Sequence, residues 1–294
     1  MVSRIRGWIA RRRLVSFLAV AYAFTWSIQG GLAISGMEAS WTHSILIGIG
    51  AFGPAIGAAV VVAASGGSLR SWIGQVFKWR IGWRWWLLAI GLPLVILSAG
   101  VALFVLGGGP INVSELPFAA IYLFAMVWGI ILGGGQEELG WRGFMLPLLQ
   151  DRFSALTSSL IIGLAWAGWH LPLFLNPTTV HGGWPLRQQL IWFLTIFAGS
   201  ILWTWMYNST GGSVLAVAVF HAGINAMGIF HPADMDLLAP NGIPDPWLTL
   251  LSEVTGAVPL VVLAILLVVY YGPDRISPGE KPGPEVLGLD SAEV

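Results

Sequence analysis

Two adjacent carboxylates, Glu137 and Glu138, and an arginine, Arg142, stand within apolar sequence long enough to cross a membrane. Ionisable side chains are costly in a bilayer, and they are kept mostly where they pair, line a water-filled cavity or take part in chemistry. A helix places Glu138 and Arg142 on one face as an ion pair, while Glu137 points about 100° away. Glu137 is then available as a general base. One structural salt bridge of all three side chains is the alternative that this spacing leaves open.

Two later apolar segments carry isolated polar side chains. His170 follows Trp166 by one helical turn and precedes Pro172, and His221 and Asn225 are again four residues apart. Taken singly, each is explained by hydrogen bonding, to a backbone carbonyl for His170 and between helices for the pair. Taken with the carboxylates, they supply a base, two imidazoles and a neutral donor. A hydrolase needs such groups to activate water and to stabilise the oxyanion that forms on the attacked carbonyl.

Other hydrolytic designs are absent from the sequence. The chain has no cysteine, no His-Glu-x-x-His, no Gly-x-Ser-x-Gly and no pair of aspartates in apolar segments. Two histidines and a carboxylate, here His170, His221 and Glu137, have the ligand chemistry to hold Zn²⁺ with a position open for water. A glutamate that activates water directly needs no metal. We expect no obligatory cofactor and keep Zn²⁺ as the alternative.

The elements that must position these residues are membrane helices. The chain is 56% hydrophobic and only 10% charged, whereas a soluble domain carries about 25% charged residues. This predicts an all-α polytopic membrane protein, a bundle of about eight helices around an intramembrane cavity. Stretches of spanning length cover about 14–35, 43–64, 85–107, 116–134, 154–175, 187–207, 211–230 and 248–271.

The division of the chain follows from the same pattern. We expect one transmembrane catalytic domain over 1–271, with its motif core at about 116–230, and a disordered cytoplasmic tail over 272–294, which is rich in proline, glycine and charge. Arginine and lysine gather in the N-terminus and in the 65–84 loop, on one side of the bundle. The positive-inside rule then places both termini in the cytoplasm. A cleaved signal peptide ending near 21–23 is disfavoured, because the apolar run continues to the length of a full span.

Four further ionisable residues fall outside the motifs. His43, His181 and His231 lie in or near predicted loops, and we expect them at the surface. Glu253, near the start of the last span, is expected to be interfacial or packed. None of the four is therefore assigned to the site.

The three motifs together resemble those of the CPBP family of intramembrane proteases, which includes CAAX prenyl endopeptidases of the Rce1 type and bacterial Abi proteins. The resemblance rests on Glu137-Glu138-x-x-x-Arg142, on an aromatic three residues before a histidine (Trp166 to His170), and on His221-x-x-x-Asn225, in this order over about residues 116–230. Trp166 stands where the family often has phenylalanine. The resemblance implies an eight-helix fold whose catalytic cavity lies inside the membrane.

The resemblance also implies a role for each residue. Glu137 activates the attacking water together with His170, and His221 and Asn225 stabilise the oxyanion. Glu138, Arg142 and Trp166 support them.

The function expected is a multi-pass endopeptidase of the cell membrane, surrounded by lipid, that cleaves a membrane-associated or lipidated peptide or protein. No nucleic acid partner is expected. Two alternatives use the same polar side chains. One is a non-catalytic membrane scaffold or immunity protein, and the other is a proton-coupled transporter. Against the transporter, the sequence shows no internal repeat of the kind that many transporters carry.

Overall fold

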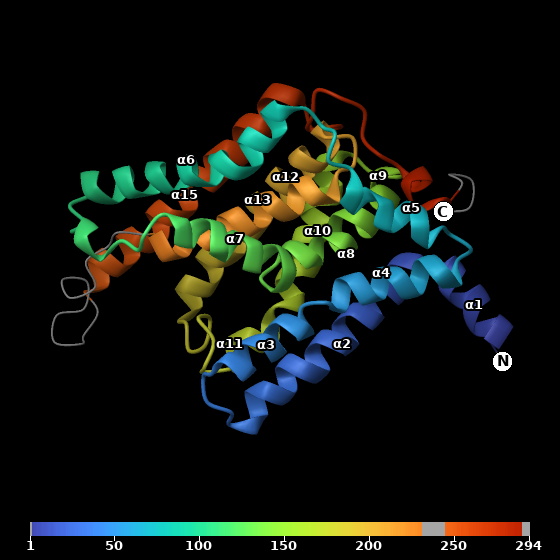
Figure 1. Ribbon diagram of the computed structural model, residues 1–294, viewed down its shortest axis with the longest axis horizontal. Helices are drawn as coiled ribbons and strands as arrows, with labels where there is room; N and C mark the ends of the chain where they lie inside the picture. The colour runs from blue at the N-terminus through green and yellow to red at the C-terminus, as the bar shows by residue number, and fades with distance from the viewer. Residues whose placement is uncertain (1, 231–244, 290–294) are drawn as a thin grey trace.

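The computed structural model describes residues 2–230 and 245–289. Within these ranges the regular elements are helices, and no strand forms, which confirms the all-α fold class. The α-helices, labelled in Figure 1, are α1 (Val2–Arg11), α2 (Arg13–Ser35), α3 (Trp41–Gly50), α4 (Gly53–Ala64), α5 (Leu69–Gly74), α6 (Trp83–Leu106), α7 (Ala120–Leu132), α8 (Glu138–Gly140), α9 (Leu146–Gln150), α10 (Ala155–Trp169), α11 (Leu171–Leu175), α12 (Leu186–Ser209), α13 (Val214–Met227) and α15 (Pro246–Tyr271).

Seven helical segments in the described ranges are long and apolar enough to cross a membrane, judged by length and composition. They are Arg13–Ser35, Trp41–Ala64, Trp83–Leu106, Ala120–Gln150, Ala155–Leu175, Leu186–Ser209 and Pro246–Tyr271. The eighth predicted span, 211–230, forms α13, whose 14 residues extend for about 21 Å. The hydrocarbon core of a bilayer is about 30 Å thick. α13 is therefore an internal helix, with most of its residues buried.

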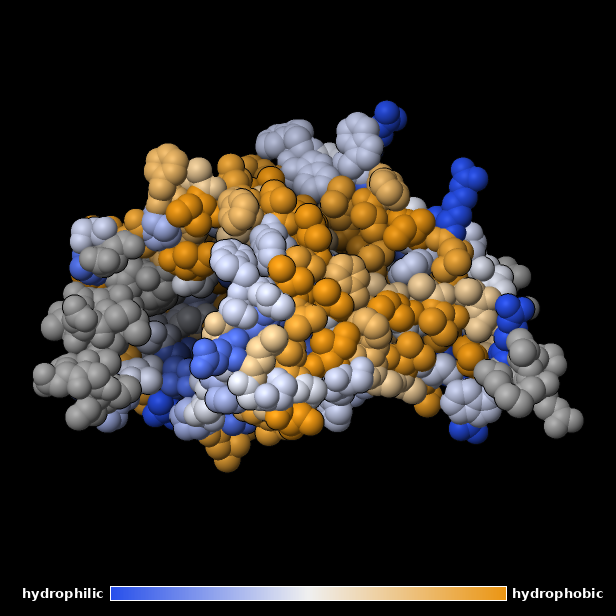
Figure 2. Space-filling model, turned by 60° about the horizontal axis from the view of Figure 1, so that its bottom comes forward, coloured by the Kyte–Doolittle hydropathy of each residue, from blue (hydrophilic) through white to orange (hydrophobic). Residues whose placement is uncertain are grey.

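The helices lie in three layers (Figure 1). α6 and α15 contact each other on one side, and α2 packs with α3 and α4 on the other. Between them, α13 contacts α6, α7 and α12. Figure 2 shows apolar side chains over most of one outer face, with hydrophilic side chains gathered toward its two ends. That surface suits a hydrocarbon surrounding.

The segment from Ala120 to Gln150 departs from a regular membrane helix. The sequence predicts a span over 116–134 followed by a connection, but the connection is itself helical and buried. It passes through a 3₁₀ turn at Gly135–Glu137, α8, and a π-helical turn at Trp141–Met145 before α9. Irregular backbone is tolerated at membrane depth where protein surrounds it. Here a Cβ on Gly140 would lie 2.4 Å from the Cβ of Pro54 in α4, so the two backbones touch.

The helices that bring histidines to the centre have local start and stop signals. Ser154 and Ser213 cap α10 and α13 by accepting hydrogen bonds from the backbone N–H groups of Thr157 and Ala216. α10 ends at Trp169, and α11 begins at once with Pro172 in its first turn, where a proline fits a helix start. His170 therefore sits at a bend between two helices.

The C-terminal segment differs from the expected disordered tail. Residues 272–289 pack on the bundle, with Ile276 and Leu287 fully buried. Their backbone is held by side chains of two helices, since Asn208 donates to the Arg275 carbonyl at 2.8 Å and Gln150 donates to that of Pro282 at 3.2 Å. A few apolar side chains thus hold a segment whose overall composition suggests disorder. Residues 290–294 lie outside the described ranges, and the domain boundary at 271 stays a prediction.

Candidate active site

The two carboxylates follow a break in the helix at Gly133 and Gly134. Gly134 has a φ of 116°, which L side chains rarely adopt. Its N–H donates to the side-chain oxygen of Gln136 at 3.0 Å. The chain then re-enters a helix through the 3₁₀ turn that carries Glu137, and α8 begins at Glu138. The break therefore starts a new helix within the bundle and places both carboxylates at its first turn.

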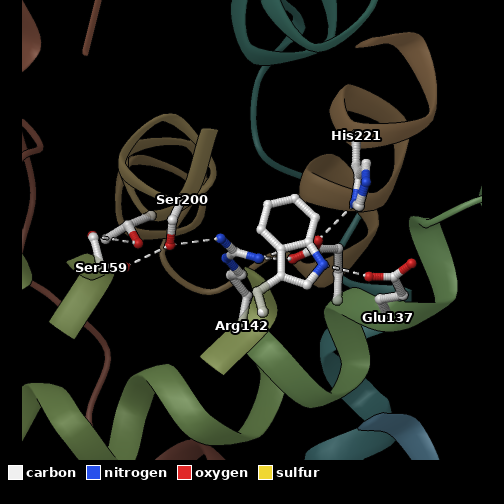
Figure 3. Close-up of polar contacts among 8 residues, drawn as sticks. Glu137, Arg142, Ser159, Ser200 and His221 are labelled. Carbon is white, nitrogen blue, oxygen red and sulfur yellow. Dashed lines mark hydrogen bonds and ion pairs between the residues drawn. The ribbon is translucent and has the colours of Figure 1, made fainter. Parts of the chain in front are cut away.

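Glu138 is enclosed by charge partners. Arg142 Nη1 donates to its Oε2 at 3.1 Å, and His221 Nδ1 lies 2.7 Å from its Oε1. The guanidinium also donates through Nη2 to Ser200 Oγ at 3.1 Å, and Ser200 donates in turn to the carbonyl of Ser159 at 2.7 Å. Figure 3 shows these contacts leading from Ser159 through Ser200 and Arg142 toward His221. We call Glu138, Arg142, Ser200 and His221 the ion-pair network. It confirms the predicted pairing of Glu138 with Arg142, and it adds His221.

Glu137 has different surroundings. Its Oε2 accepts a hydrogen bond of 2.7 Å from the indole Nε1 of Trp166 (Figure 3), and its side chain lines a cavity. Glu137 is therefore outside the salt bridge, and the reading of all three side chains as one structural ion pair is not what the structure shows. The divergence follows from the spacing, because consecutive residues on a helix point about 100° apart.

His170 is fixed in one orientation by its own helix. Its Nδ1 lies 2.8 Å from the backbone carbonyl of Trp166. A carbonyl oxygen only accepts, so Nδ1 carries the hydrogen. The neutral ring then presents an unprotonated Nε2, which can accept a proton or a hydrogen bond. The single-residue explanation, a histidine satisfied by a backbone carbonyl, accounts for only one of its two nitrogens.

His221 and Asn225 approach the same glycine break from α13. The amide nitrogen of Asn225 donates to the Gly133 carbonyl at 2.8 Å. A Cβ added to Gly134 would lie 2.6 Å from His221 Nε2 and 2.8 Å from Asn225 Nδ2. These two nitrogens therefore converge on one place, which the absence of a side chain at Gly134 keeps open.

A cavity of about 510 Å³ joins these groups. Its lining includes four of the predicted site residues that carry chemistry, together with aromatic side chains: Glu137, His170, His221, Asn225, Trp166, His181, Trp192 and Trp203. Glu138 and Arg142 do not line it, and they lie behind it with no exposed surface. The structure thus brings together every predicted site residue and divides them into those that face the cavity and those that stand behind them.

His181 also lines this cavity, although its position in a loop predicted a surface residue. Its ring packs between Trp184 at 4.8 Å and Trp192 at 5.2 Å. Burial lowers the pKa of His181 to about 4. Nothing in its sequence neighbourhood signals this, because the loop reaches the cavity only through the fold.

His43 is a second correction, and Glu253 fulfils its expectation. His43 is buried, with its Nε2 3.1 Å from the Asn176 amide nitrogen and 2.9 Å from Thr178 Oγ1. The prediction of a surface histidine missed these partners because they come from a distant loop. Glu253 is packed and paired with Arg187 at 3.1 Å. His231 lies outside the described residues.

The metal alternative was tested against the donor atoms. Glu137 Oε2, His170 Nδ1 and His221 Nδ1 each have a protein partner already. Within the described part of the chain, no three histidine, aspartate or glutamate side chains form a group that could hold a metal ion. These partners leave Glu137 Oε1 and the two Nε2 nitrogens as the donor atoms for a metal. They do not form a metal-binding group in this arrangement, and the Zn²⁺ alternative stays a prediction.

Known proteins resemble the segment that carries the site. Residues 117–227 match the family model described as type II CAAX prenyl endopeptidase Rce1-like. The CAAX prenyl protease 2 of Methanococcus maripaludis is 31% identical over 145 residues, which are 46% of this chain and 51% of that protein.

Lysostaphin resistance protein A of Staphylococcus haemolyticus is 25% identical over 145 residues, 49% of this chain and 38% of that protein. The chain therefore spans about half the length of the first relative and less of the second. Residues 117–227, which hold all three motifs, are thus similar to the Rce1-like CAAX prenyl endopeptidase family.

Proposed function

We propose that this protein is an intramembrane endopeptidase that hydrolyses a peptide bond with a water molecule activated by Glu137 and His170. The observation that carries the proposal is the single cavity that holds Glu137, His170, His221 and Asn225. Three elements far apart in sequence deliver a base, a proton acceptor and two oxyanion donors to one enclosed space. Hydrolysis is the chemistry that uses all of them.

Water activation uses the two acceptor groups of the cavity. The Glu137 carboxylate takes a proton from water, and His170 Nε2 accepts a hydrogen bond from the same water because its hydrogen is fixed on Nδ1. The water oxygen then bonds to the carbonyl carbon of the substrate. The carbonyl electrons move to its oxygen and form the oxyanion.

His221 and Asn225 receive that oxyanion. Asn225 Nδ2 has a second N–H beside the one that it gives to Gly133. His221 donates through Nε2 when it is an imidazolium, with Nδ1–H held by Glu138. Preorganised donors of this kind contribute about 2.7–4 kcal/mol each in hydrolases.

The step ends when the C–N bond breaks. Glu137 returns its proton to the departing nitrogen, which leaves as an amine, and the oxyanion collapses to a carboxylic acid. One water is consumed, and the glutamate recovers its charge. Proton transfer of this kind by a placed side chain is worth about 10²- to 10⁴-fold in rate.

The substrate class proposed is a membrane-associated or lipidated peptide. The first relative is named a CAAX prenyl protease, and the cavity lies among helices long enough to span a bilayer. A peptide that is tethered to the membrane can reach such a cavity without leaving the membrane. The orientation proposed keeps both termini in the cytoplasm, since the basic N-terminus and the basic 65–84 loop favour it.

A cleavage assay tests this function. Purified protein in detergent is incubated with a peptide set that includes lipidated C-terminal peptides, and the products are identified by mass spectrometry. Cleavage by wild type and by Glu253→Gln, an acid-to-amide control outside the cavity, with loss in Glu137→Gln, supports the proposal. Equal cleavage by Glu137→Gln contradicts it. A parallel incubation with a chelator tests whether Glu137 activates water without a metal. If the chelator abolishes cleavage and added Zn²⁺ restores it, a metal ion and not the glutamate alone activates the water.

A second candidate is non-catalytic protection of the cell, because one relative is named a resistance protein. The same variant separates the two candidates. A resistance phenotype that persists in Glu137→Gln, in a strain that carries no other copy, would favour the non-catalytic role. Loss of the phenotype together with cleavage would join the phenotype to hydrolysis.

A further inference from the structure

Trp166 lies at the centre of the site and contacts both of its halves. Its ring is 5.6 Å from that of His170 and 5.3 Å from that of His221. The Arg142 guanidinium lies 5.3 Å from its centroid. Its only polar atom, Nε1, donates to Glu137 at 2.7 Å. One side chain therefore connects the general base with the buried arginine and both histidines.

The hydrogen bond to Glu137 is of the strong kind. A donor to a charged carboxylate gives a shorter and stronger bond than a neutral pair does. An apolar cavity favours the neutral acid over the carboxylate, and a neutral acid cannot take a proton from water. A donor that binds the charged form more strongly than the neutral form offsets that preference. It also fixes Oε2, so Oε1 is the oxygen left for water.

The neighbouring tryptophans do not duplicate this contact. Trp141 lies near Glu137, and Trp203 lines the same cavity. The Trp203 indole N–H has no hydrogen-bond partner among the described atoms. The Trp141 N–H also interacts with Glu137, but it makes no hydrogen bond of regular geometry. Trp169, on the same helix, donates instead to Thr25 Oγ1 at 2.8 Å. The hydrogen bond from Trp166 therefore differs from those of the other tryptophans because its acceptor is the Glu137 carboxylate.

We propose that Trp166 is a positioning residue, whose indole N–H holds the Glu137 carboxylate in its charged form and in the orientation that leaves Oε1 free for water. The inference rests on the proposed function, since it assigns Glu137 as the base. The proposal assigns the role to the indole N–H, and not to the size of the aromatic ring that lines the cavity. A phenylalanine fills most of the same space and cannot donate.

The test is Trp166→Phe in the cleavage assay, with kcat and KM measured separately. We expect kcat to fall about 10- to 100-fold, the range for a lost hydrogen bond to a charged group, with KM within about threefold of wild type. Two matched variants accompany it. Trp169→Phe loses one buried indole hydrogen bond away from Glu137, and Trp203→Phe alters the cavity wall without losing one. Both should lower kcat less than Trp166→Phe does.

A second readout does not depend on cleavage. Infrared spectra of the protein at neutral pH should show a stronger neutral carboxylic acid band in Trp166→Phe than in wild type. The increase should vanish in the double variant Trp166→Phe/Glu137→Gln. If wild type cleaves nothing, the proposed function fails, while this spectrum still decides the inference. The inference is overturned if the band is no stronger than in wild type, or if Trp166→Phe lowers kcat no more than Trp169→Phe.

Discussion

Glu137 and Glu138 are neighbours in the chain, yet they belong to two different regions of the molecule. Glu138 meets two partners, the Arg142 guanidinium and the His221 imidazole, and neither Glu138 nor Arg142 has any exposed side-chain surface. Glu137 meets a neutral indole and an open cavity. A carboxylate that is bonded to a guanidinium and an imidazole is neutralised and fixed in place. A carboxylate with one neutral donor keeps one oxygen free to react. We therefore call the ion-pair network the support, and the residues that line the cavity, Glu137 among them, the cavity face.

Removing the charge of Glu138 should give the largest effect on stability. Glu138→Gln leaves Arg142 buried without its carboxylate, and breaking such a pair costs about 3–5 kcal/mol. Glu137→Gln should leave the unfolding free energy nearly unchanged, because its partner is neutral. Chemical unfolding in detergent, followed by circular dichroism, measures both variants. Similar losses in the two variants would contradict the division into a support and a cavity face.

Adding a methyl group at the glycine break should disturb the two groups of the cavity face that approach it. In Gly134→Ala the new Cβ would meet His221 Nε2 and Asn225 Nδ2 within 3 Å, at a backbone angle that alanine resists. A displacement of about 1 Å at a catalytic site can cost about 10²-fold in rate, and we expect a loss of that order in kcat.

Gly91→Ala is the matched control, since a Cβ there meets nothing within 4 Å and the residue does not line the cavity. It should retain wild-type cleavage. If Gly134→Ala cleaves as well as this control, the two nitrogens do not act at the position that Gly134 keeps open.

The long outer helices could be predicted from the sequence because a bilayer makes length and hydropathy informative. Seven predicted spans correspond to the seven long helical segments in the described ranges. α13 was expected to be a full span because its composition is equally apolar. Hydropathy does not distinguish a helix that faces lipid from one enclosed by other helices. The C-terminal segment was misjudged for a related reason, since Ile276 and Leu287 bury themselves within a polar stretch.

The site was predictable where residues lie one helical turn apart. The pairing of Glu138 with Arg142 and the contact of His170 with the turn of Trp166 follow from helix geometry. Ser200 and His181 could not be found in this way. Ser200 reaches Arg142 from 58 residues further along the chain, and His181 reaches the cavity from a loop. Contacts of that range depend on how the helices pack, which no local spacing records.

The hydroxyl of Ser200 tests whether the ion-pair network stabilises the fold. Ser200→Ala removes the acceptor of Arg142 Nη2, and an unsatisfied buried donor costs about 1–3 kcal/mol. The control is Ser158→Ala, also fully buried, whose hydroxyl has no hydrogen-bond partner among the described atoms. Unfolding in detergent should show a loss for Ser200→Ala and almost none for Ser158→Ala. Equal losses would mean that the serine position, and not its bond to the guanidinium, matters.

The smallest expected effect is a pH dependence of the unfolding free energy that comes from His181 in the cavity lining. Burial lowers the pKa of His181 to about 4, whereas the same residue in an unfolded chain titrates near 6.5. Between about pH 6.5 and 4 the unfolded chain therefore binds more protons, so stability contributed by neutral His181 is lost as the pH falls through this window. His181→Phe keeps an aromatic ring against Trp184 and Trp192 and removes the titration. Its unfolding midpoint should fall less steeply than that of wild type from pH 7 to pH 4.5, and an unchanged slope would show that His181 is not kept neutral by the wall of this cavity.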